Sequence, residues 1–273
     1  MKKVLIKGLK IIVCLYIIVC TLLYFFQEKL IFFPEKLAPD YRFAFSQPFE
    51  EINVNAPDGV SLHNILFKAR QSKGVIFYLH GNMGSLRSWG KVAQLYLSMD
   101  YDVFMPDYRG YGKSNGSIGS EMQFYADMQA DYNTLKKQYP ENQIIVLGYS
   151  IGTGPAANLA AANNPKILIL QAPYYNLKDM MGKRFPIVPT FLLKYKFDTA
   201  AGIQNCRMPV TIFHGDADEV IYYGSSLKLQ THFKSSDTLI TLHGQKHNGM
   251  TDNPEYVGAI SKILGYNNGS PTN

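Results

Sequence analysis

Residues 146–161 read VLGYSIGTGPAANLAA, which places a serine between two glycines where an apolar run ends and an alanine-rich run begins. The letters IIVLGY before the serine are typical of a buried strand, and TGPAANLAA after it, with an early proline, is typical of a helix. Glycine is unfavourable in both elements, so Gly148 and Gly152 indicate a tight turn in which side chains would clash. The pattern G-x-S-x-G at such a turn predicts that Ser150 is a strained nucleophile with its hydroxyl exposed above the strand ends.

Short, continuous apolar runs recur along the chain, separated mostly by stretches long enough for a helix. They read GVIFYLH, YDVFMP, QIIVLGY, KILILQA and PVTIFHG. Continuous apolarity is typical of parallel strands that are covered on both faces. Before them, EINVNAPDGVSLHNILFKA alternates apolar and polar residues around Asp58 and Gly59, which predicts an antiparallel hairpin. We therefore predict an α/β protein with a mostly parallel sheet, helices on both faces and an N-terminal antiparallel hairpin.

A serine nucleophile needs a base within hydrogen-bond reach, and that base needs a carboxylate to orient it. In a sheet of this kind both should lie on loops after later strands, the acid first and the histidine second. The segment PVTIFHGDADEVIYY offers Asp216 and Asp218, and TLITLHGQKHNGM offers His243 and His247. Asp218 and His247 lie further beyond their strand ends than the alternatives, so we predict them as acid and base.

The same chemistry requires two backbone amides that stabilise a developing oxyanion. The amide of Ile151, at the start of the helix after the serine, is one predicted donor. The loop FYLHGNMGS supplies the other, with Asn82 as the predicted donor and Met83 as its nearest competitor. Gly81 permits close approach there, and His80 is expected to brace this loop rather than act as a base.

The glycine-rich segments do not fit a nucleotide site. GYSIGTG lacks the spacing G-x-G-x-x-G of a dinucleotide-binding loop. YRGYGKSNG ends like a phosphate-binding loop at Gly112, Lys113 and Ser114, but Asp107 stands where that loop needs a glycine. We therefore predict no nucleotide cofactor.

The N-terminal segment, residues 1–27, is predicted to be a membrane anchor. Its run IIVCLYIIVCTLLYFF carries no charge and, with the apolar residues before it, is long enough to cross a bilayer. No small-residue cleavage site follows, although a cleaved signal peptide or a buried core helix remains an alternative. The formal charge of +6 is concentrated in the lysines that precede the run. By the positive-inside tendency the N-terminus is then cytoplasmic and the catalytic domain extracytoplasmic.

Composition excludes several other classes. Beyond the N-terminal lysines the chain is nearly neutral and has no nucleic-acid reader motif, so no nucleic-acid partner is predicted. Three cysteines, two of them within the anchor, predict no disulfide framework. We expect a connector at 28–50, a catalytic domain at 51–266 and a polar tail at 267–273. Residues 173–206 break the strand and helix alternation and are predicted to be a cap insertion above the sheet.

The motifs HGNMGS, PDYRGYGKSNG, GYSIGTG, HGDADEV and KHN, in this order, resemble the α/β-hydrolase superfamily. They are most similar to its small membrane-anchored serine hydrolases, a branch that includes protein depalmitoylases. The resemblance spans about residues 30–264 and implies Ser150 as nucleophile, Asp218 as acid and His247 as base. It also implies a domain that needs no metal or organic cofactor. Those depalmitoylases reach the membrane through an acylated, cysteine-rich N-terminus, which this chain lacks, so their substrate is not carried over.

These observations predict a serine hydrolase that cleaves an ester or thioester through an acyl-enzyme. The anchor and the apolar segment FPIVPTFLLKYKF favour an acyl or amphipathic substrate near the membrane. Two alternatives stay open, namely an amidase or peptidase with the same triad, and a catalytically silent, membrane-tethered binding protein.

Overall fold

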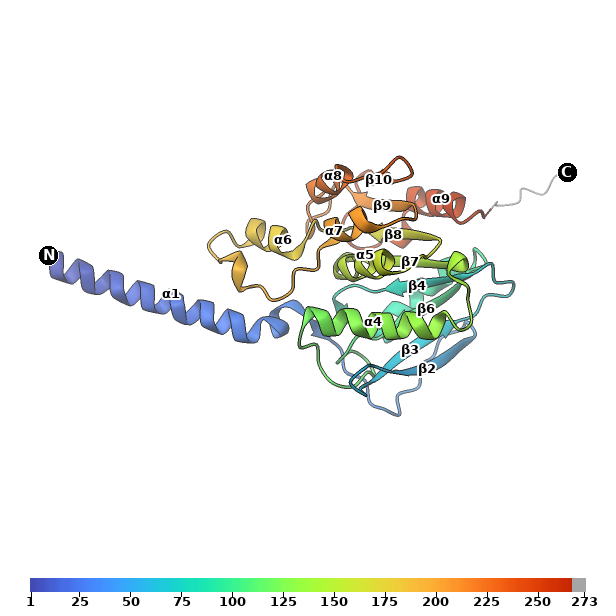
Figure 1. The fold of residues 1–273 in the computed structure, drawn as a ribbon, viewed down its shortest axis with the longest axis horizontal. Coiled ribbons are helices and arrows are strands. Elements are labelled where there is room, and N and C mark those ends of the chain that lie inside the picture. The colour runs from blue at the N-terminus through green and yellow to red at the C-terminus, as the bar shows by residue number, and fades with distance from the viewer. Residues whose placement is uncertain (267–273) are drawn as a thin grey trace.

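The computed structural model describes residues 1–266, so the predicted tail at 267–273 lies outside the described residues. An eight-stranded sheet in the order β10-β9-β8-β7-β4-β6-β3-β2 forms the centre of the protein (Figure 1). Its strands are β2 (Phe49–Asn55), β3 (Ser61–Phe67), β4 (Val75–Leu79), β6 (Asp102–Pro106), β7 (Ile144–Tyr149), β8 (Ile167–Gln171), β9 (Val210–Gly215) and β10 (Thr238–Leu242). Strand β3 pairs antiparallel with β2 and β6, and the other neighbours are parallel. The predicted fold class and the N-terminal hairpin are therefore confirmed.

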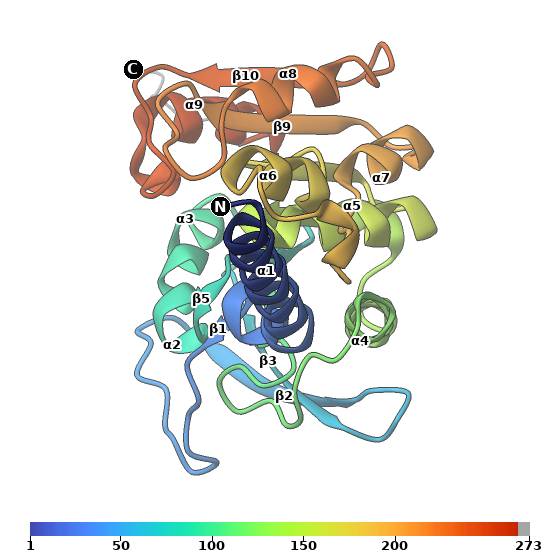
Figure 2. The ribbon, with the colours of Figure 1, turned by 90° about the vertical axis from the view of Figure 1, so that its left-hand side faces the viewer.

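Helices cover both faces of this sheet (Figure 2). The helices are α1 (Lys2–Ile31), α2 (Leu86–Trp89), α3 (Ala93–Leu97), α4 (Glu121–Leu135), α5 (Thr153–Ala162), α6 (Leu177–Arg184), α7 (Thr199–Asn205), α8 (Gly224–Gln230) and α9 (Pro254–Ile263). Short 3-10 turns are η1 (Gly90–Val92), η2 (Glu141–Gln143), η3 (Ser150–Gly152), η4 (Thr190–Leu192) and η5 (Met250–Asp252). One core lies between the sheet and α4, α5 and α7, and the other between the sheet and α2, α3 and α9.

The two cores explain the continuous apolar runs. In β4, Val75, Phe77 and Leu79 enter the first core. Ile76 and Tyr78 enter the second, and all five side chains are buried. A strand between two cores must be apolar at every position, because successive side chains point to opposite faces.

The chain before the main sheet forms a long helix and a short strand. Helix α1 projects from the domain, is exposed along its apolar window, and is long and apolar enough to cross a membrane (Figure 1). After it, β1 (Phe33–Pro34) pairs with β5 (Met83–Gly84), in the loop that follows β4. This pairing places the domain end of α1 at the carboxyl edge of the parallel strands.

The turn at Ser150 has the close packing that its two glycines predict. Ser150 has a φ of 53°, which is a strained conformation for a residue with a side chain. A Cβ on Gly148 would lie 2.6 Å from the carbonyl oxygen of Gly152, and a Cβ on Gly152 would lie 2.4 Å from that of Leu79. Both distances are shorter than van der Waals contact with main-chain atoms that cannot rotate away, so only glycine fits at either position.

We expect Gly152→Ala to lower the free energy of unfolding by about 2 kcal/mol or more, because the main chain of β4 or of the turn must shift. The matched control is Gly258→Ala in α9, where a Cβ meets nothing within 4 Å. That change should be neutral or stabilise by up to about 1 kcal/mol. Thermal unfolding of both variants in detergent micelles checks this, and equal melting temperatures would contradict the close packing.

Candidate active site

The structure brings Ser150, His247 and Asp218 into one hydrogen-bonded chain. The Nε2 atom of His247 lies 3.0 Å from Oγ of Ser150, and its Nδ1 atom lies 2.7 Å from Oδ2 of Asp218. Ser150 begins η3 directly after β7, Asp218 follows β9, and His247 follows β10. Because these strands are parallel, their carboxyl ends meet at one edge of the sheet and place the three side chains together.

Asp218 is held as a buried carboxylate. Its side chain is 0% exposed, and its Oδ1 accepts hydrogen bonds from the amides of Val220 and Ile221 at 2.8 and 2.9 Å. Burial alone would raise the pKa of Asp218, but hydrogen bonds from His214 and His247 outweigh it and hold the pKa well below the usual range. The carboxylate therefore remains ionised and fixes the orientation of the His247 ring.

Ser150 and His247 are less accessible than the sequence pattern predicts. Ser150 is 9% exposed and His247 is 8% exposed, so the expectation of an exposed hydroxyl is wrong. Nε2 of the His247 imidazole contacts the hydroxyl of Ser150. The hydroxyl of Tyr149 in turn donates to the carbonyl oxygen of His247 at 2.8 Å. Both side chains are therefore largely covered by the rest of the domain.

The alternative acid and base form a separate pair. His243 and Asp216 lie 3.1 Å apart, with side chains that are 76% and 38% exposed. Asp216 also accepts the amide of Gly244, which holds the turn after β10. This pair makes no hydrogen bond to Ser150 within the described residues, so it stabilises a surface turn.

Sequence reasoning missed His214, which supports Asp218 from the end of β9. Its buried ring lies with Nε2 3.3 Å from Oδ2 of Asp218 and 2.9 Å from the carbonyl oxygen of Ile221. Its Nδ1 lies 2.6 Å from the hydroxyl of Ser226. If the proton of His214 is on Nε2, that atom donates to Asp218 and to the carbonyl oxygen of Ile221, while Nδ1 accepts from the hydroxyl of Ser226. The spacing H-x-x-x-D is too common to have indicated this role, which depends on the fold of the loop after β9.

The predicted oxyanion donors lie in loops that neighbouring side chains hold firmly. The hydroxyl of Tyr111 donates to the carbonyl oxygen of Asn82 at 2.7 Å, and that of Tyr174 donates to the carbonyl oxygen of Ile151 at 2.9 Å. Within residues 1–266 the amide of Asn82 donates to no protein atom. It therefore remains available to a bound ligand.

His80 braces the loop that carries Asn82, as expected. It is fully buried, its Nδ1 lies 2.7 Å from the carbonyl oxygen of Gly81, and its ring stacks on Tyr108 with centroids 4.1 Å apart. Burial lowers the pKa of His80, so its ring stays neutral in the core.

Metal-ligand clusters and the buried cysteine are the other chemical groups of interest in the described chain. Among residues 1–266 no cluster of three or more His, Cys, Asp or Glu side chains is arranged to hold a metal ion. Cys206 is buried, and burial raises the pKa of its thiol.

Comparisons with known proteins agree with the fold. Residues 74–201 match the family model for the alpha/beta hydrolase fold. The chain belongs to the alpha/beta hydrolase family and is a hydrolase. It is 30% identical over 200 residues to human alpha/beta hydrolase domain-containing protein 17B, covering 71% of this chain and 67% of that protein. It is 29% identical over 194 residues to alpha/beta hydrolase domain-containing protein aho-3 of Caenorhabditis elegans, covering 69% and 57% of the two chains.

Solved structures show the same fold at lower identity. An esterase of Pyrococcus furiosus superposes with a TM-score of 0.69 and 18% identity, covering 86% of this chain and 97% of that chain. The hydrolase GrgF of Penicillium sp. sh18 superposes with a TM-score of 0.67 and 16% identity, covering 80% and 97%. At these identities the likeness establishes the fold alone.

We expect His214→Phe to lower kcat about tenfold with little change in KM, because Asp218 loses a charge-assisted hydrogen bond while the ring volume stays. His214→Gln keeps an amide donor and should recover part of the activity. Hydrolysis of a p-nitrophenyl ester by the full chain measures both parameters. If both variants lost kcat equally, or if KM rose instead, His214 would not act through Asp218.

Proposed function

We propose that this hydrolase is a serine esterase or thioesterase in which Ser150 is the nucleophile, His247 the general base and Asp218 the orienting acid. The observation that carries the proposal is the hydrogen-bonded chain from Ser150 through His247 to Asp218. A nucleophile, a base and a buried carboxylate in this order are the groups that acyl transfer needs.

The proposed reaction has two steps. Oγ of Ser150 attacks the substrate carbonyl carbon while Nε2 of His247 takes the hydroxyl proton, and the amides of Ile151 and Asn82 hold the oxyanion. Collapse of this intermediate breaks the bond to the alcohol or thiol, which leaves with the proton from His247. Water then attacks the acyl-enzyme with His247 again as the base, which releases the acid and restores Ser150. Asp218 stays ionised and stabilises the imidazolium in both steps.

The substrate we propose is an acyl or amphipathic molecule that reaches the enzyme at a membrane surface. Residues 1–27 would anchor the chain and 28–50 would connect them to the catalytic domain at 51–266, with the cap at 173–206. The long apolar helix α1 and its N-terminal lysines support this arrangement. They also favour a cytoplasmic N-terminus, with the catalytic domain on the other side of the membrane.

A fluorophosphonate probe, which reacts covalently with activated serines, tests the nucleophile. We expect it to label the folded wild type and not Ser150→Ala, whose turnover should fall at least about a thousandfold. His247→Ala should also lose labelling, whereas His243→Ala should keep it, since the ring of His243 pairs with Asp216 at the surface. Labelling that survived in Ser150→Ala, or an unlabelled but folded wild type, would contradict the proposed mechanism.

A series of p-nitrophenyl esters tests the substrate class. We expect kcat/KM to rise from acetyl to medium and long acyl chains, because a longer chain buries more apolar surface on the enzyme. The Ser150→Ala variant gives the background rate for each ester. A preference for acetyl would reject the lipid-like substrate and leave the serine mechanism intact.

A further inference from the structure

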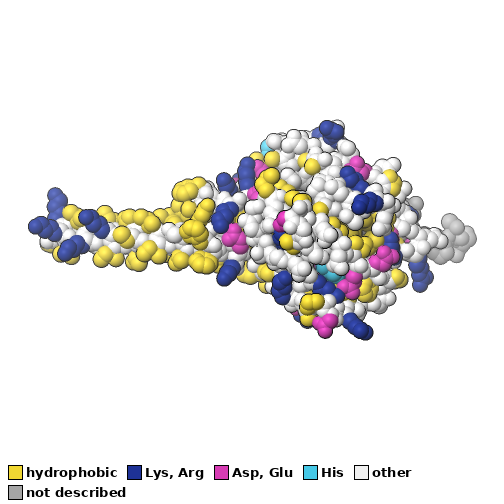
Figure 3. Space-filling view, turned by 60° about the horizontal axis from the view of Figure 1, so that its bottom comes forward, with side chains coloured by type: hydrophobic (Ala, Val, Ile, Leu, Met, Phe, Trp, Pro, Cys, Tyr) yellow, Lys and Arg dark blue, Asp and Glu magenta, His cyan; other side chains and the backbone are white. Residues whose placement is uncertain are grey.

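The cap carries large apolar side chains that face solvent beside α1. Phe185, Ile187 and Phe191 are 55%, 80% and 77% exposed. They belong to the segment 185–192, which follows α6 and ends in η4. Figure 3 shows apolar side chains projecting from the domain next to the apolar surface of the helix. An apolar cluster of this kind that faced water would promote aggregation, so it indicates that another molecule covers this surface.

Hydrogen bonds tie this cap segment along the side of α1. The hydroxyl of Tyr16 donates to the carbonyl oxygen of Ile187 at 2.7 Å. The side-chain amide of Gln27 donates to the carbonyl oxygen of Leu192 at 3.1 Å and accepts the amide of Lys194 at 2.8 Å. The segment therefore runs beside α1 from Gln27 back toward its N-terminal half.

These contacts determine the depth of the segment in a membrane that α1 crosses. At about 1.5 Å per residue, Tyr16 lies about 16 Å along the helix from Gln27, or about 12 Å in depth if the helix tilts by about 40°. Residues 11–27 carry no charge and must occupy much of the hydrocarbon layer, which is about 30 Å thick. The carbonyl oxygen of Ile187, bonded to Tyr16, then lies well inside that layer.

Part of the backbone of the segment is satisfied without water, although the amides of Ile187, Thr190 and Phe191 donate to no protein atom among the described residues. Non-helical chain in lipid must satisfy its polar groups internally, because no water is there to do so. Pro186 and Pro189 have no amide hydrogen to satisfy. The amide of Val188 donates to Phe185, that of Leu192 donates to Pro189, and two carbonyls accept from side chains of α1 as described above. The anchor helix thus supplies hydrogen bonds that water would supply on a soluble surface.

Basic residues flank the apolar tip on both sides. Lys183 and Arg184 precede it at the end of α6, and Lys194 and Lys196 follow it. Lys194 pairs with Glu28 of α1 at 3.1 Å, which places it near the domain end of the helix. An apolar tip between basic flanks matches a bilayer, where lysine and arginine lie among the headgroups and attract anionic lipid.

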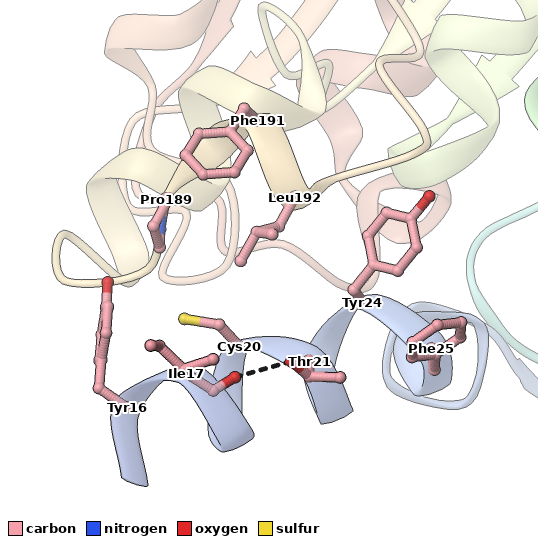
Figure 4. A pocket seen from close by; sticks show the side chains of 9 residues that line it. All are labelled: Tyr16, Ile17, Cys20, Thr21, Tyr24, Phe25, Pro189, Phe191 and Leu192. Carbon is pink, nitrogen blue, oxygen red and sulfur yellow. Dashed lines mark hydrogen bonds between the residues drawn. The ribbon is translucent and has the colours of Figure 1, made fainter. Parts of the chain in front are cut away.

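A groove of about 330 Å³ separates the cap segment from α1 (Figure 4). Its lining consists of Tyr16, Ile17, Cys20, Thr21, Tyr24, Phe25, Pro189, Phe191 and Leu192. None of these side chains is charged, and Tyr16, Cys20 and Tyr24 extend from α1 toward the cap segment (Figure 4). At this depth lipid acyl chains surround the groove, and an apolar groove of this kind accommodates an acyl chain.

We infer that residues 185–192 form a second membrane-embedded element, which inserts beside α1 into the hydrocarbon layer and takes a lipid acyl chain into the groove between them. The inference rests on the proposed crossing of the membrane by α1. Two attachments hold the domain in one orientation on the bilayer, since a single helix leaves it free to rotate and tilt.

Depth-dependent fluorescence quenching tests the inference on the full chain. An environment-sensitive fluorophore is attached to a single cysteine at position 187, 17 or 71, in a chain with Cys14, Cys20 and Cys206 replaced by serine. Gln71 is the aqueous control, because it is exposed in the loop before β4, at the opposite edge of the sheet. The protein is reconstituted in vesicles of phosphatidylcholine and phosphatidylglycerol with nitroxide-labelled acyl chains.

We expect the label at 187 to show blue-shifted emission and a loss of fluorescence comparable to that at 17, while the label at 71 stays unquenched. If the label at 187 stayed unquenched like that at 71 while the label at 17 was quenched, the membrane insertion of residues 185–192 would be rejected. The proposed membrane crossing by α1 would then be retained. If neither 17 nor 187 was quenched, both would be rejected. Should the chain without cysteines fail to fold, a genetically encoded fluorescent amino acid at the same positions gives the same comparison.

Discussion

The close approach of the turn at Ser150 to the end of β4 is the constraint on which the site depends. Gly148 and Gly152 leave no room for a Cβ, and the turn forces Ser150 to a φ of 53°. A strained residue persists only where its surroundings determine its conformation, and here buried strands on either side do so. Packing of the core thus stabilises this conformation and fixes the position of the Ser150 hydroxyl above the sheet.

The electrostatics of the site follow from its burial. A carboxylate away from water is unfavourable unless hydrogen bonds replace its hydration. Asp218 receives such bonds from two backbone amides and two imidazoles, and its pKa falls despite the burial. Asp216 lies only two residues away but faces solvent, where its pairing with His243 contributes little to the stability of the fold. The same residue type therefore has two roles that only its surroundings distinguish.

The cap joins the site to the helix that projects from the domain. Its segment 185–192 packs on α1, and its following helix α7 packs on α5, which starts at the turn of Ser150. The long apolar helix and the candidate nucleophile are therefore linked through contacts of one continuous insertion.

The sequence by itself determined the mostly parallel sheet, the hairpin and the turn at Ser150, because apolar periodicity and glycine spacing are local properties. It also indicated His247 and Asp218 over His243 and Asp216, since the first two lie further beyond the ends of their strands. Only the tertiary structure decided that His214 supports Asp218, that Ser150 is mostly buried, and that the cap lies along α1. Each of these depends on contacts between residues distant in the chain or on loop conformation, which neither composition nor periodicity records.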